Sequence, residues 1–205
     1  MPTRRTLDNQ KTREPMTLTP ITYKDVRGYK DETGKFMPAS GSALDLLFPS
    51  AMSWIDQKYL DEGTKCHQEM KEALEWRMFN EEWPKSKNPR VAALLEALEE
   101  WKFIPLEAEQ PRCSYIYGHA GMPDALMTRN DLYVIPDWKF AESIDERYEY
   151  QLESYLPFFS TYLPRPALML FQVTREAKVK AIVVKPNAKR WALFLNALAV
   201  LKFRL

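Results

Sequence analysis

The stretch AGMPDALMTRNDLYVIPDWK, residues 120–139, decides the fold of this chain. It consists of two runs with alternating apolar residues, 120–127 and 132–139, and a set of turn residues between them, 129–131. This pattern predicts a β-hairpin within a sheet. Because residues i and i+2 of a strand point to the same face, we expect Asp137 and Lys139 to share a face, with Asp124 brought alongside by the hairpin.

Two carboxylates and a lysine at one spot suit metal-assisted hydrolysis. Converging carboxylates repel each other, and each raises the pKa of the other unless a cation compensates. Their hard oxygen ligands suit Mg²⁺ or Mn²⁺, which lowers the pKa of bound water and neutralises charge on a phosphate. A lysine one side chain away can orient or deprotonate that water. Asp124, Asp137 and Lys139 therefore indicate phosphodiester hydrolysis with one or two metal ions.

The rest of the chain shows helical spacing before the hairpin and a mixture of strands and helices after it. Asn88 and Asn187 are expected to cap helices, and Pro89 suits a first helical position. The predicted helices are 43–47, 51–55, 61–79, 91–101, 145–162 and 187–203. The predicted strands are 103–109, 114–118, 120–127, 132–139, 167–174 and 179–185.

This order of elements predicts an α/β fold with a mixed central sheet flanked by helices. The core pattern is αβββαβ, and further helices precede it. Residues 1–36 are polar and rich in turn signals, so we expect an N-terminal arm with at most one short strand at 21–26. Residues 37–205 are expected to form a single domain, with a helical prefix at 42–102 and the catalytic sheet and helices at 103–205.

Composition argues against several classes of protein. The chain has 205 residues, and its uncharged stretches are shorter than the roughly 20 apolar residues that span a bilayer. Its N-terminus has no apolar signal-peptide core. We therefore expect a cytoplasmic protein with no membrane partner. Its two cysteines, Cys66 and Cys113, form no CxxC pair, which argues against a zinc ribbon or an iron-sulfur cluster.

The charge distribution suggests a surface for phosphates. The net charge is only +1, but residues 166–205 hold eight Lys or Arg against one acid, Glu176. An acidic centre beside a basic end is what a metal site next to a DNA-binding surface requires. The alternative is that these charges are ordinary solvated faces. The residues expected to contact DNA are Lys178, Lys180, Lys185, Lys189 and Arg190.

The motifs resemble those of a known nuclease superfamily. PD at 123–124, a spacer of about a dozen residues and DWK at 137–139 are similar to the signature of the PD-(D/E)XK nucleases, whose restriction-endonuclease-like core has the αβββαβ order. GTKCH at 63–67 and QLESY at 151–155 resemble the Gly-x-x-x-His and Gln-x-x-x-Tyr elements of the RecB and lambda-exonuclease-like branch, which includes phage-type recombination nucleases. The resemblance covers about residues 38–185.

The resemblance implies a role for each motif residue at the metal centre. Asp124, Asp137 and the backbone carbonyl of Trp138 would be metal ligands, and His67 would complete the metal shell. Lys139 would be the catalytic lysine. The competing interpretation of His67 is an ordinary histidine on a helix surface, and an isolated Asp-x-Lys pair is common on solvated strands. Trp138 also fits a packing role.

Other residues have weaker assignments. Through the resemblance, Gln151 and Tyr155 would contact DNA or support the lysine, and Glu109 would be an accessory acid. His119 is expected to face away from Asp124 and to be structural, because an odd number of positions separates them. Packing roles are also favoured for three further residues, namely Cys66, Tyr148 and Tyr150.

These observations favour an enzyme that hydrolyses DNA with Mg²⁺ or Mn²⁺. The resemblance implies an exonuclease of recombination, repair or phage DNA processing, in a bacterial or phage-infected cell. The alternatives are a structure-specific endonuclease and a non-catalytic DNA-binding or recombination scaffold on the same fold. Besides DNA, the resemblance suggests a single-strand annealing or recombination protein as a partner, and a homo-oligomer.

Overall fold

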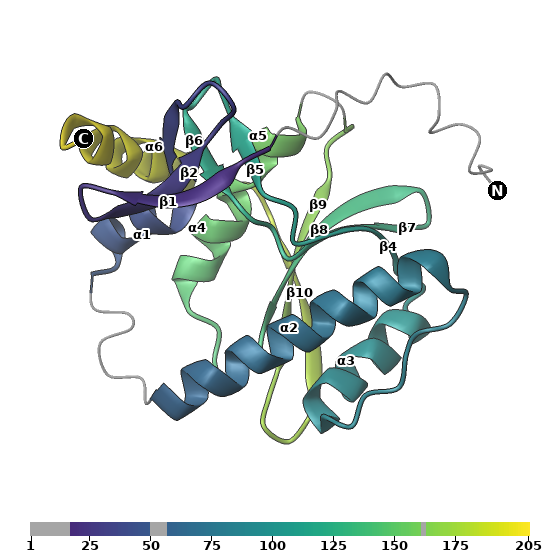
Figure 1. The fold of residues 1–205 in the computed structure, drawn as a ribbon. Helices are drawn as coiled ribbons and strands as arrows, with labels where there is room; N and C mark the ends of the chain where they lie inside the picture. The colour runs from purple at the N-terminus through teal and green to yellow at the C-terminus, as the bar shows by residue number, and fades with distance from the viewer. Residues whose placement is uncertain (1–16, 50–56, 161–162) are drawn as a thin grey trace.

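The computed structural model describes residues 17–49, 57–160 and 163–205, which form a mixed α/β structure (Figure 1). The helices are α1 (Ser40–Leu47), α2 (Gln57–Phe79), α3 (Pro89–Glu100), α4 (Glu146–Ser154), α5 (Leu156–Phe159) and α6 (Ala188–Phe203). The strands are β1 (Thr19–Tyr23), β2 (Val26–Lys30), β3 (Phe36–Pro38), β4 (Ile104–Ala108), β5 (Arg112–Ser114), β6 (His119–Gly121), β7 (Ala125–Arg129), β8 (Leu132–Lys139), β9 (Ala167–Val173) and β10 (Val179–Val184). Within these residues, no helix is both long enough and apolar enough to cross a bilayer.

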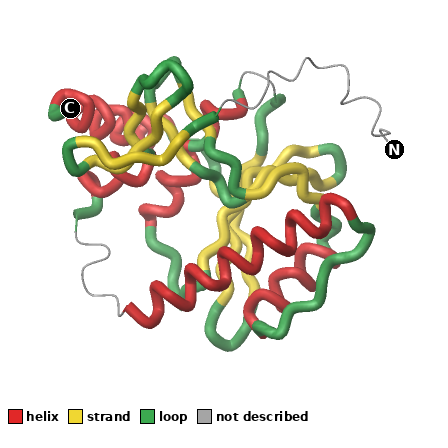
Figure 2. Tube along the Cα trace, in the orientation of Figure 1, coloured by secondary structure: helices red, strands yellow, loops and turns green. Residues whose placement is uncertain are grey.

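The central sheet is mixed, as the sequence predicts. Its five strands lie in the order β10-β9-β8-β7-β4, with β8 and β9 parallel and the other neighbours antiparallel. The parallel pair needs a long crossover, and α4 and α5 lie in the chain between β8 and β9. Figure 2 shows these central strands in yellow with red helices around them.

Helices cover both faces of this sheet because its central strands are apolar on both sides. On one face, Val134, Trp138 and Phe171 pack in a core with residues of α2 and α3. On the other face, Ile135 and Leu170 pack with residues of α4 and α5. Alternation along β8 separates the two sets, so Asp137, two positions after Ile135, belongs to the α4 side. Figure 1 shows α2 and α3 together on one side of the sheet.

Strands β7 and β8 pair only next to their turn and then separate. Their register runs from Arg129↔Leu132 to Met127↔Val134 and ends there, whereas β8 goes on pairing with β9 up to Lys139. Pro136 lies just after the point of separation and has no N–H to donate. Backbone N–H groups of residues i and i+2 point to the same side of a strand, so the N–H of residue 136 would face β7 as that of Val134 does. Proline at this position leaves β7 without that hydrogen-bond donor. The proline therefore favours the separation of the two strands.

A second group of elements packs against the α4 side. Strands β1, β2 and β3 form an antiparallel sheet, β5 and β6 form a two-stranded sheet, and Ala39 bridges to Ala120. Helices α1 and α6 share a core that includes Leu44, Tyr150 and Phe194. Asn187 caps α6 by accepting from the N–H groups of residues 189 and 190.

Several local predictions need correction. Residues 19–38 form three strands, more than the single short strand expected at 21–26. The predicted strand at 114–118 is mostly a turn, closed by the Gly118 N–H on the carbonyl of Ser114, and 120–127 is divided between β6 and β7. The helix predicted at 145–162 breaks into α4 and α5 next to Pro157, because proline disrupts a helix interior. The helix predicted at 51–55 lies outside the described residues.

Other local predictions are confirmed. Asn88 caps α3 by accepting from the N–H of Arg90, with Pro89 at the first helical position. Cys66 is buried in the core, as expected. His119 is fully buried and its Nε2 lies 3.0 Å from the carbonyl oxygen of Ser154, which agrees with a structural role.

Candidate active site

Asp124 and the end of β8 meet where β7 and β8 separate. Asp124 directly precedes β7, and its Oδ2 accepts a hydrogen bond of 2.9 Å from the N–H of Trp138. This N–H points to the side of β8 from which β7 has departed, so the aspartate occupies a place that a paired strand would otherwise fill. The backbone carbonyl of Asp124 accepts from the N–H of Glu109 at 3.0 Å. The hairpin thus brings Asp124 to β8, as the sequence predicts.

Asp137 is the most buried ionisable group of the cluster. Its side chain is 0% exposed, and the Lys139 ammonium lies 2.7 Å from Oδ2. Oδ2 is therefore engaged by the lysine, whereas Oδ1 accepts no hydrogen bond among the described residues. Buried polar atoms in native proteins are nearly always satisfied, and exceptions call for an explanation such as a bound ion or a water. Asp137 is therefore a site for an additional donor or cation.

Burial shifts the pKa values of these charged groups. It raises the pKa of Asp124 and that of Asp137 to about 6, against the opposing effect of the Lys139 ammonium. For Lys139, burial alone would lower the pKa, but the charges of Asp137 and Asp124 outweigh it and raise the pKa. The lysine therefore stays protonated at neutral pH. For both carboxylates, burial therefore outweighs the stabilisation of the charged form that the Lys139 ammonium provides.

Helix α2 brings a histidine to the same place. The Nδ1 of His67 lies 3.6 Å from Oδ1 of Asp124, and the ring packs edge-on against Phe140 at 5.7 Å between centroids. Burial, and to a smaller extent the positive charge of Lys139, lowers the pKa of His67 to about 4. The imidazole is therefore neutral at pH 7, which is the form that can ligate a metal.

Glu109 lies beside this group on the β4 side. Its backbone has a φ of 43°, in the left-handed region that non-glycine residues seldom adopt. Its Oε2 is 3.8 Å from Nζ of Lys71, which lies one turn beyond His67 on α2. Burial raises the pKa of Glu109, while Lys71 opposes the rise. Sequence reasoning missed Lys71, although its i+4 spacing from His67 places both on one helix face.

Helix α4 contributes the remaining polar groups. Gln151 Nε2 donates to the hydroxyl of Tyr155 at 2.9 Å, as their i, i+4 spacing predicts. Burial and the charge of Asp137 raise the pKa of Tyr155 well above its usual value, so its hydroxyl stays protonated. Tyr148, predicted to be a packing residue, has its ring centroid 4.7 Å from Nζ of Lys139. The sequence contained no local signal for this contact.

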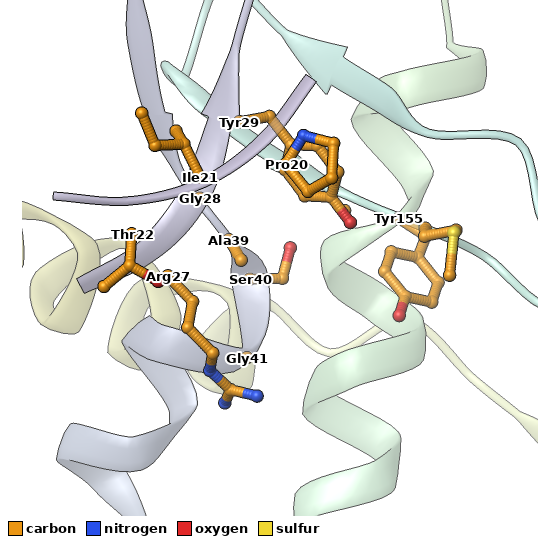
Figure 3. A pocket seen from close by; sticks show the side chains of 12 residues that line it. Pro20, Ile21, Thr22, Arg27, Gly28, Tyr29, Ala39, Ser40, Gly41 and Tyr155 are labelled. Atoms are coloured by element: carbon orange, nitrogen blue, oxygen red, sulfur yellow. The ribbon is translucent and has the colours of Figure 1, made fainter. Parts of the chain in front are cut away.

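A cavity of about 550 Å³ opens beside Tyr155 (Figure 3). Its walls come from β1 and β2, from the start of α1 and from the segment after β6. Figure 3 shows Tyr155 on α4 across from Ser40 and Arg27. Tyr155 lines this cavity, and the charge of Asp137 helps to raise its pKa. It is therefore the residue of the cavity wall that interacts with the carboxylates.

The basic residues expected to contact DNA fall into two groups. Three of them are exposed: Lys180 on the edge strand β10, Lys185 just after it, and Lys189 in the first turn of α6. Lys178 is also exposed and pairs with Glu176 at 2.5 Å. Arg190 differs, because its side chain is 10% exposed and pairs with two carboxylates, those of Glu149 and Glu153. Its charge is paired with these two carboxylates within the protein, and its predicted contact with DNA stays a prediction.

The donor set at β8 fits a hard divalent cation. As the side chains stand, no group of three or more His, Cys, Asp and Glu residues converges closely enough to hold a metal ion within the described part of the chain. However, Asp124, Asp137 and the neutral His67 supply oxygen and nitrogen atoms that can ligate a metal, and Oδ1 of Asp137 accepts no hydrogen bond among the described residues. The Lys139 ammonium compensates Asp137 in this arrangement.

The fold and the site together define an α/β protein with a buried Asp, Asp, Lys centre at the separation of two central strands. No protein-family model matches the chain, and no curated protein sequence matches it. Among solved structures, it is similar to an alkaline exonuclease, LHK-Exo, from Laribacter hongkongensis, with 14% identity and a TM-score of 0.42 over 55% of this chain and 64% of that one.

A second solved structure, described as SSO0001, is similar over 53% of this chain and 55% of its own length, with 15% identity and a TM-score of 0.33. In both comparisons the matched part spans less than two thirds of the other protein. Similarity at this level assigns no activity to the chain.

Proposed function

We propose that this chain is a divalent-metal-dependent nuclease that hydrolyses phosphodiester bonds in DNA. The observation that carries the proposal is the state of Asp137, which is fully buried, with the protonated Lys139 2.7 Å from Oδ2 as its partner and with Oδ1 accepting no hydrogen bond among the described residues. A carboxylate buried only for stability is normally satisfied by donors, because leaving it unsatisfied is costly. A divalent cation bound at this centre would provide the partner that Oδ1 of the buried carboxylate lacks.

The residues that would hold the ion are Asp124, Asp137 and His67, with the carbonyl of Trp138 as a further oxygen donor. The N–H and the carbonyl of a strand residue point to the same side, and the N–H of Trp138 points to Asp124. When bound, a divalent ion would lower the pKa of a ligated water and offset the charge of the scissile phosphate. Mg²⁺ and Mn²⁺ suit such oxygen-rich sets best.

Lys139 would act by donating hydrogen bonds. Its raised pKa keeps it an ammonium, so it cannot accept the proton of the attacking water. It can orient that water and stabilise negative charge that develops on the phosphate, in a site that excludes bulk solvent. Asp137 holds the ammonium in place at 2.7 Å.

The other α4 residues would frame the substrate. The hydroxyl of Tyr155, fixed by Gln151, stays protonated and can donate to a phosphate oxygen. The cavity of about 550 Å³ beside Tyr155 lies in the size range of small-ligand pockets, roughly 300–1,000 Å³, and has room for a nucleotide. The exposed Lys178, Lys180 and Lys185 would contact phosphates farther along the DNA.

We favour exonuclease over endonuclease action, in recombination, repair or phage DNA processing, because of the motif resemblance. The first experiment is the degradation of end-labelled linear DNA and of covalently closed circles with Mg²⁺, Mn²⁺ or EDTA. Asp137→Asn is compared with Asp131→Asn, the same change at the exposed turn of the same hairpin. We expect metal-dependent loss of the linear substrate by the wild type and by Asp131→Asn, and none by Asp137→Asn.

The outcomes separate the alternatives. Cutting of the circle would make the protein an endonuclease. No cleavage with any cation would contradict the proposed function, and DNA retention by the metal-free protein would then favour a scaffold. Calorimetric titration with Mn²⁺ alone provides a readout besides activity, in which Asp137→Asn should bind the ion at least tenfold more weakly than Asp131→Asn, about the effect of losing one charged ligand.

A further inference from the structure

The first turn of α4 places an aromatic ring against the proposed catalytic lysine. The centroid of the Tyr148 ring lies 4.7 Å from Nζ of Lys139, inside the roughly 6 Å limit of a cation–π contact. The same Nζ lies 2.7 Å from Oδ2 of Asp137, and the Lys139 side chain is 13% exposed. The ammonium thus has a carboxylate as one neighbour and an aromatic face as another.

The position of Tyr148 is fixed by contacts that do not involve Lys139. Asp145 caps α4 by accepting from the N–H of Arg147 at 2.7 Å, and its carbonyl accepts from the N–H of Tyr148 at 3.1 Å. The guanidinium of Arg147 pairs with Asp45 of α1 at 2.6 Å. The ring of Tyr148 also packs at the edge of the core between α4 and the sheet. It is therefore a preformed support for the ammonium.

A lysine side chain needs such a support to act from one place. Its long flexible stem allows many rotamers, and a point charge paired with one carboxylate can pivot about it. Reactions that depend on the placement of a group lose rate when that group is displaced by about 1 Å. The face of an aromatic ring attracts an ammonium without forming a directional hydrogen bond. The three donors of Lys139 would stay available for Asp137, water and phosphate.

We propose that Tyr148 is a positioning residue that holds the ammonium of Lys139 through its ring face. The inference rests on the proposed nuclease function for its consequence in catalysis, but the contact itself can be measured in the metal-free protein. A ring-face contact predicts that Tyr148→Phe keeps the effect and that Tyr148→Leu, which preserves apolar bulk without a ring, loses it.

The contact is tested first by NMR of the full chain labelled with carbon-13 lysine, without metal or DNA. The Cε signal of Lys139 is identified by its disappearance in Lys139→Met. We expect it to carry a ring-current shift that Tyr148→Phe keeps and Tyr148→Leu removes. The matched control is Tyr59→Leu, which removes a ring 4.0 Å from the guanidinium of Arg175 and should leave the Lys139 signal in place. An unchanged Lys139 signal in folded Tyr148→Leu would overturn the inference.

The catalytic consequence is tested by the rate of DNA cleavage at saturating metal. We expect Tyr148→Leu to lower kcat about tenfold with little change in KM, the size that a partly desolvated cation–π contact allows. Tyr148→Phe should restore most of the loss. A rise in KM alone would indicate a base-stacking role and overturn positioning, as would a Phe variant as slow as the Leu variant, since the hydroxyl would then matter rather than the ring.

The design keeps the two proposals apart. Absence of metal-dependent cleavage by the wild type contradicts the proposed function, while the lysine NMR signal still decides whether Tyr148 holds the ammonium. Cleavage by the wild type together with an undiminished kcat in Tyr148→Leu overturns the positioning role and leaves the proposed function standing. Equal urea midpoints of the Leu and Phe variants establish that the comparison concerns the ring rather than folding.

Discussion

Helix α4 separates two clusters of buried charge that differ in how completely they are satisfied. On one side, Arg190 pairs with Glu149 and Glu153, and its guanidinium also donates to the carbonyl of Lys185. On the other side, Asp137 pairs with Lys139 through Oδ2, but its Oδ1 accepts no hydrogen bond among the described residues. One helix thus borders an ion-pair network with its hydrogen bonds made and a centre with one buried acceptor left open.

The difference shows how to tell a structural ion pair from a functional one. Glu153 is 5% exposed and accepts at both oxygens, from Arg190 and from the N–H of Asn187 at 2.8 Å, so it ties α4 to the cap of α6. Asp137 is equally buried but ties nothing together beyond Lys139. Polar residues that are buried for stability make their hydrogen bonds, whereas a buried acceptor without a donor can bind a cation or a ligand. Changes on each side should therefore affect different properties.

The largest expected effect is the loss of catalysis when the Lys139 ammonium is removed from the cluster around Asp137. Lys139→Ala should lower DNA cleavage by about a thousandfold, because the water and the phosphate lose their charged donor. Mn²⁺ binding and DNA binding should persist, since Asp124 and Asp137 remain. Single-turnover cleavage and calorimetry measure the two properties. A Lys139→Ala protein that still cleaves DNA at a near wild-type rate would remove the lysine from the mechanism.

Removing the Arg190 guanidinium from the cluster with Glu149 and Glu153 should lower stability and leave catalysis unchanged. Arg190→Ala leaves Glu153 buried without its partner, which costs on the order of 3–5 kcal/mol of unfolding free energy. Urea unfolding measures the loss, and kcat per folded molecule should stay near that of the wild type. Glu149→Gln, at a position 37% exposed, should cost far less. A large fall in kcat with unchanged stability would mean that Arg190 contacts DNA after all.

The pH dependence of stability should carry opposite signs at the buried histidines and at Asp137. The pKa of His119 is lowered by burial to about 4, so its contribution is present above about 6.5 and is lost as the pH falls to 4, up to about 3 kcal/mol. The pKa of Asp137 is raised by burial to about 6, so its contribution is present below about 3.8 and is lost as the pH rises through 6.

Urea unfolding in EDTA between pH 4 and 7 measures these contributions. We expect His119→Gln to become relatively more stable at the acid end, and Asp137→Asn to become relatively more stable at the neutral end. His67, whose pKa is also lowered to about 4, should behave as His119 does when it is replaced by Gln. Shifts of the same sign in the His119 and Asp137 variants would contradict the assigned environments.

The central sheet could be predicted because local patterns determine it. The alternation in 132–139 and the turn at 129–131 gave the hairpin, and Asn88 with Pro89 gave the start of α3. Only one short strand was expected in 19–38, because β1 and β2 are largely exposed, so their alternation is weak, and β3 has only three residues. Tyr115 and Ile116 look like strand residues but lie in a turn, where Gly118 adopts a positive φ of 61°.

The candidate site could be predicted in part for the same reason. Asp124, Asp137 and Lys139 come together because the hairpin register and strand period bring them together, and both are visible in the sequence. The contact of Tyr148 with Lys139 depends on how α4 packs on the sheet, and Lys71 depends on the approach of α2 to β4. The i+4 spacing of Lys71 from His67 places both on one helix face, but the contacts that these side chains make leave no mark in local spacing. The partners of Arg190 likewise cannot be read from its local pattern, so its place in the basic C-terminal region suggested a phosphate contact.

A third kind of ion pair is exposed to solvent, and its removal should have the smallest effect on stability. Lys178 and Glu176 are 76% and 71% exposed, so Lys178→Ala should change the unfolding free energy by less than about 0.5 kcal/mol. If Lys178 contacts a phosphate, the slope of log K for DNA binding against log salt should become shallower by about one, because one fewer counterion is released. The matched control is Lys87→Ala, an exposed lysine between α2 and α3, which should leave the slope unchanged. Equal slopes for both variants would exclude the β9–β10 turn from the DNA surface and leave the exposed residues Lys180, Lys185 and Lys189 to provide it.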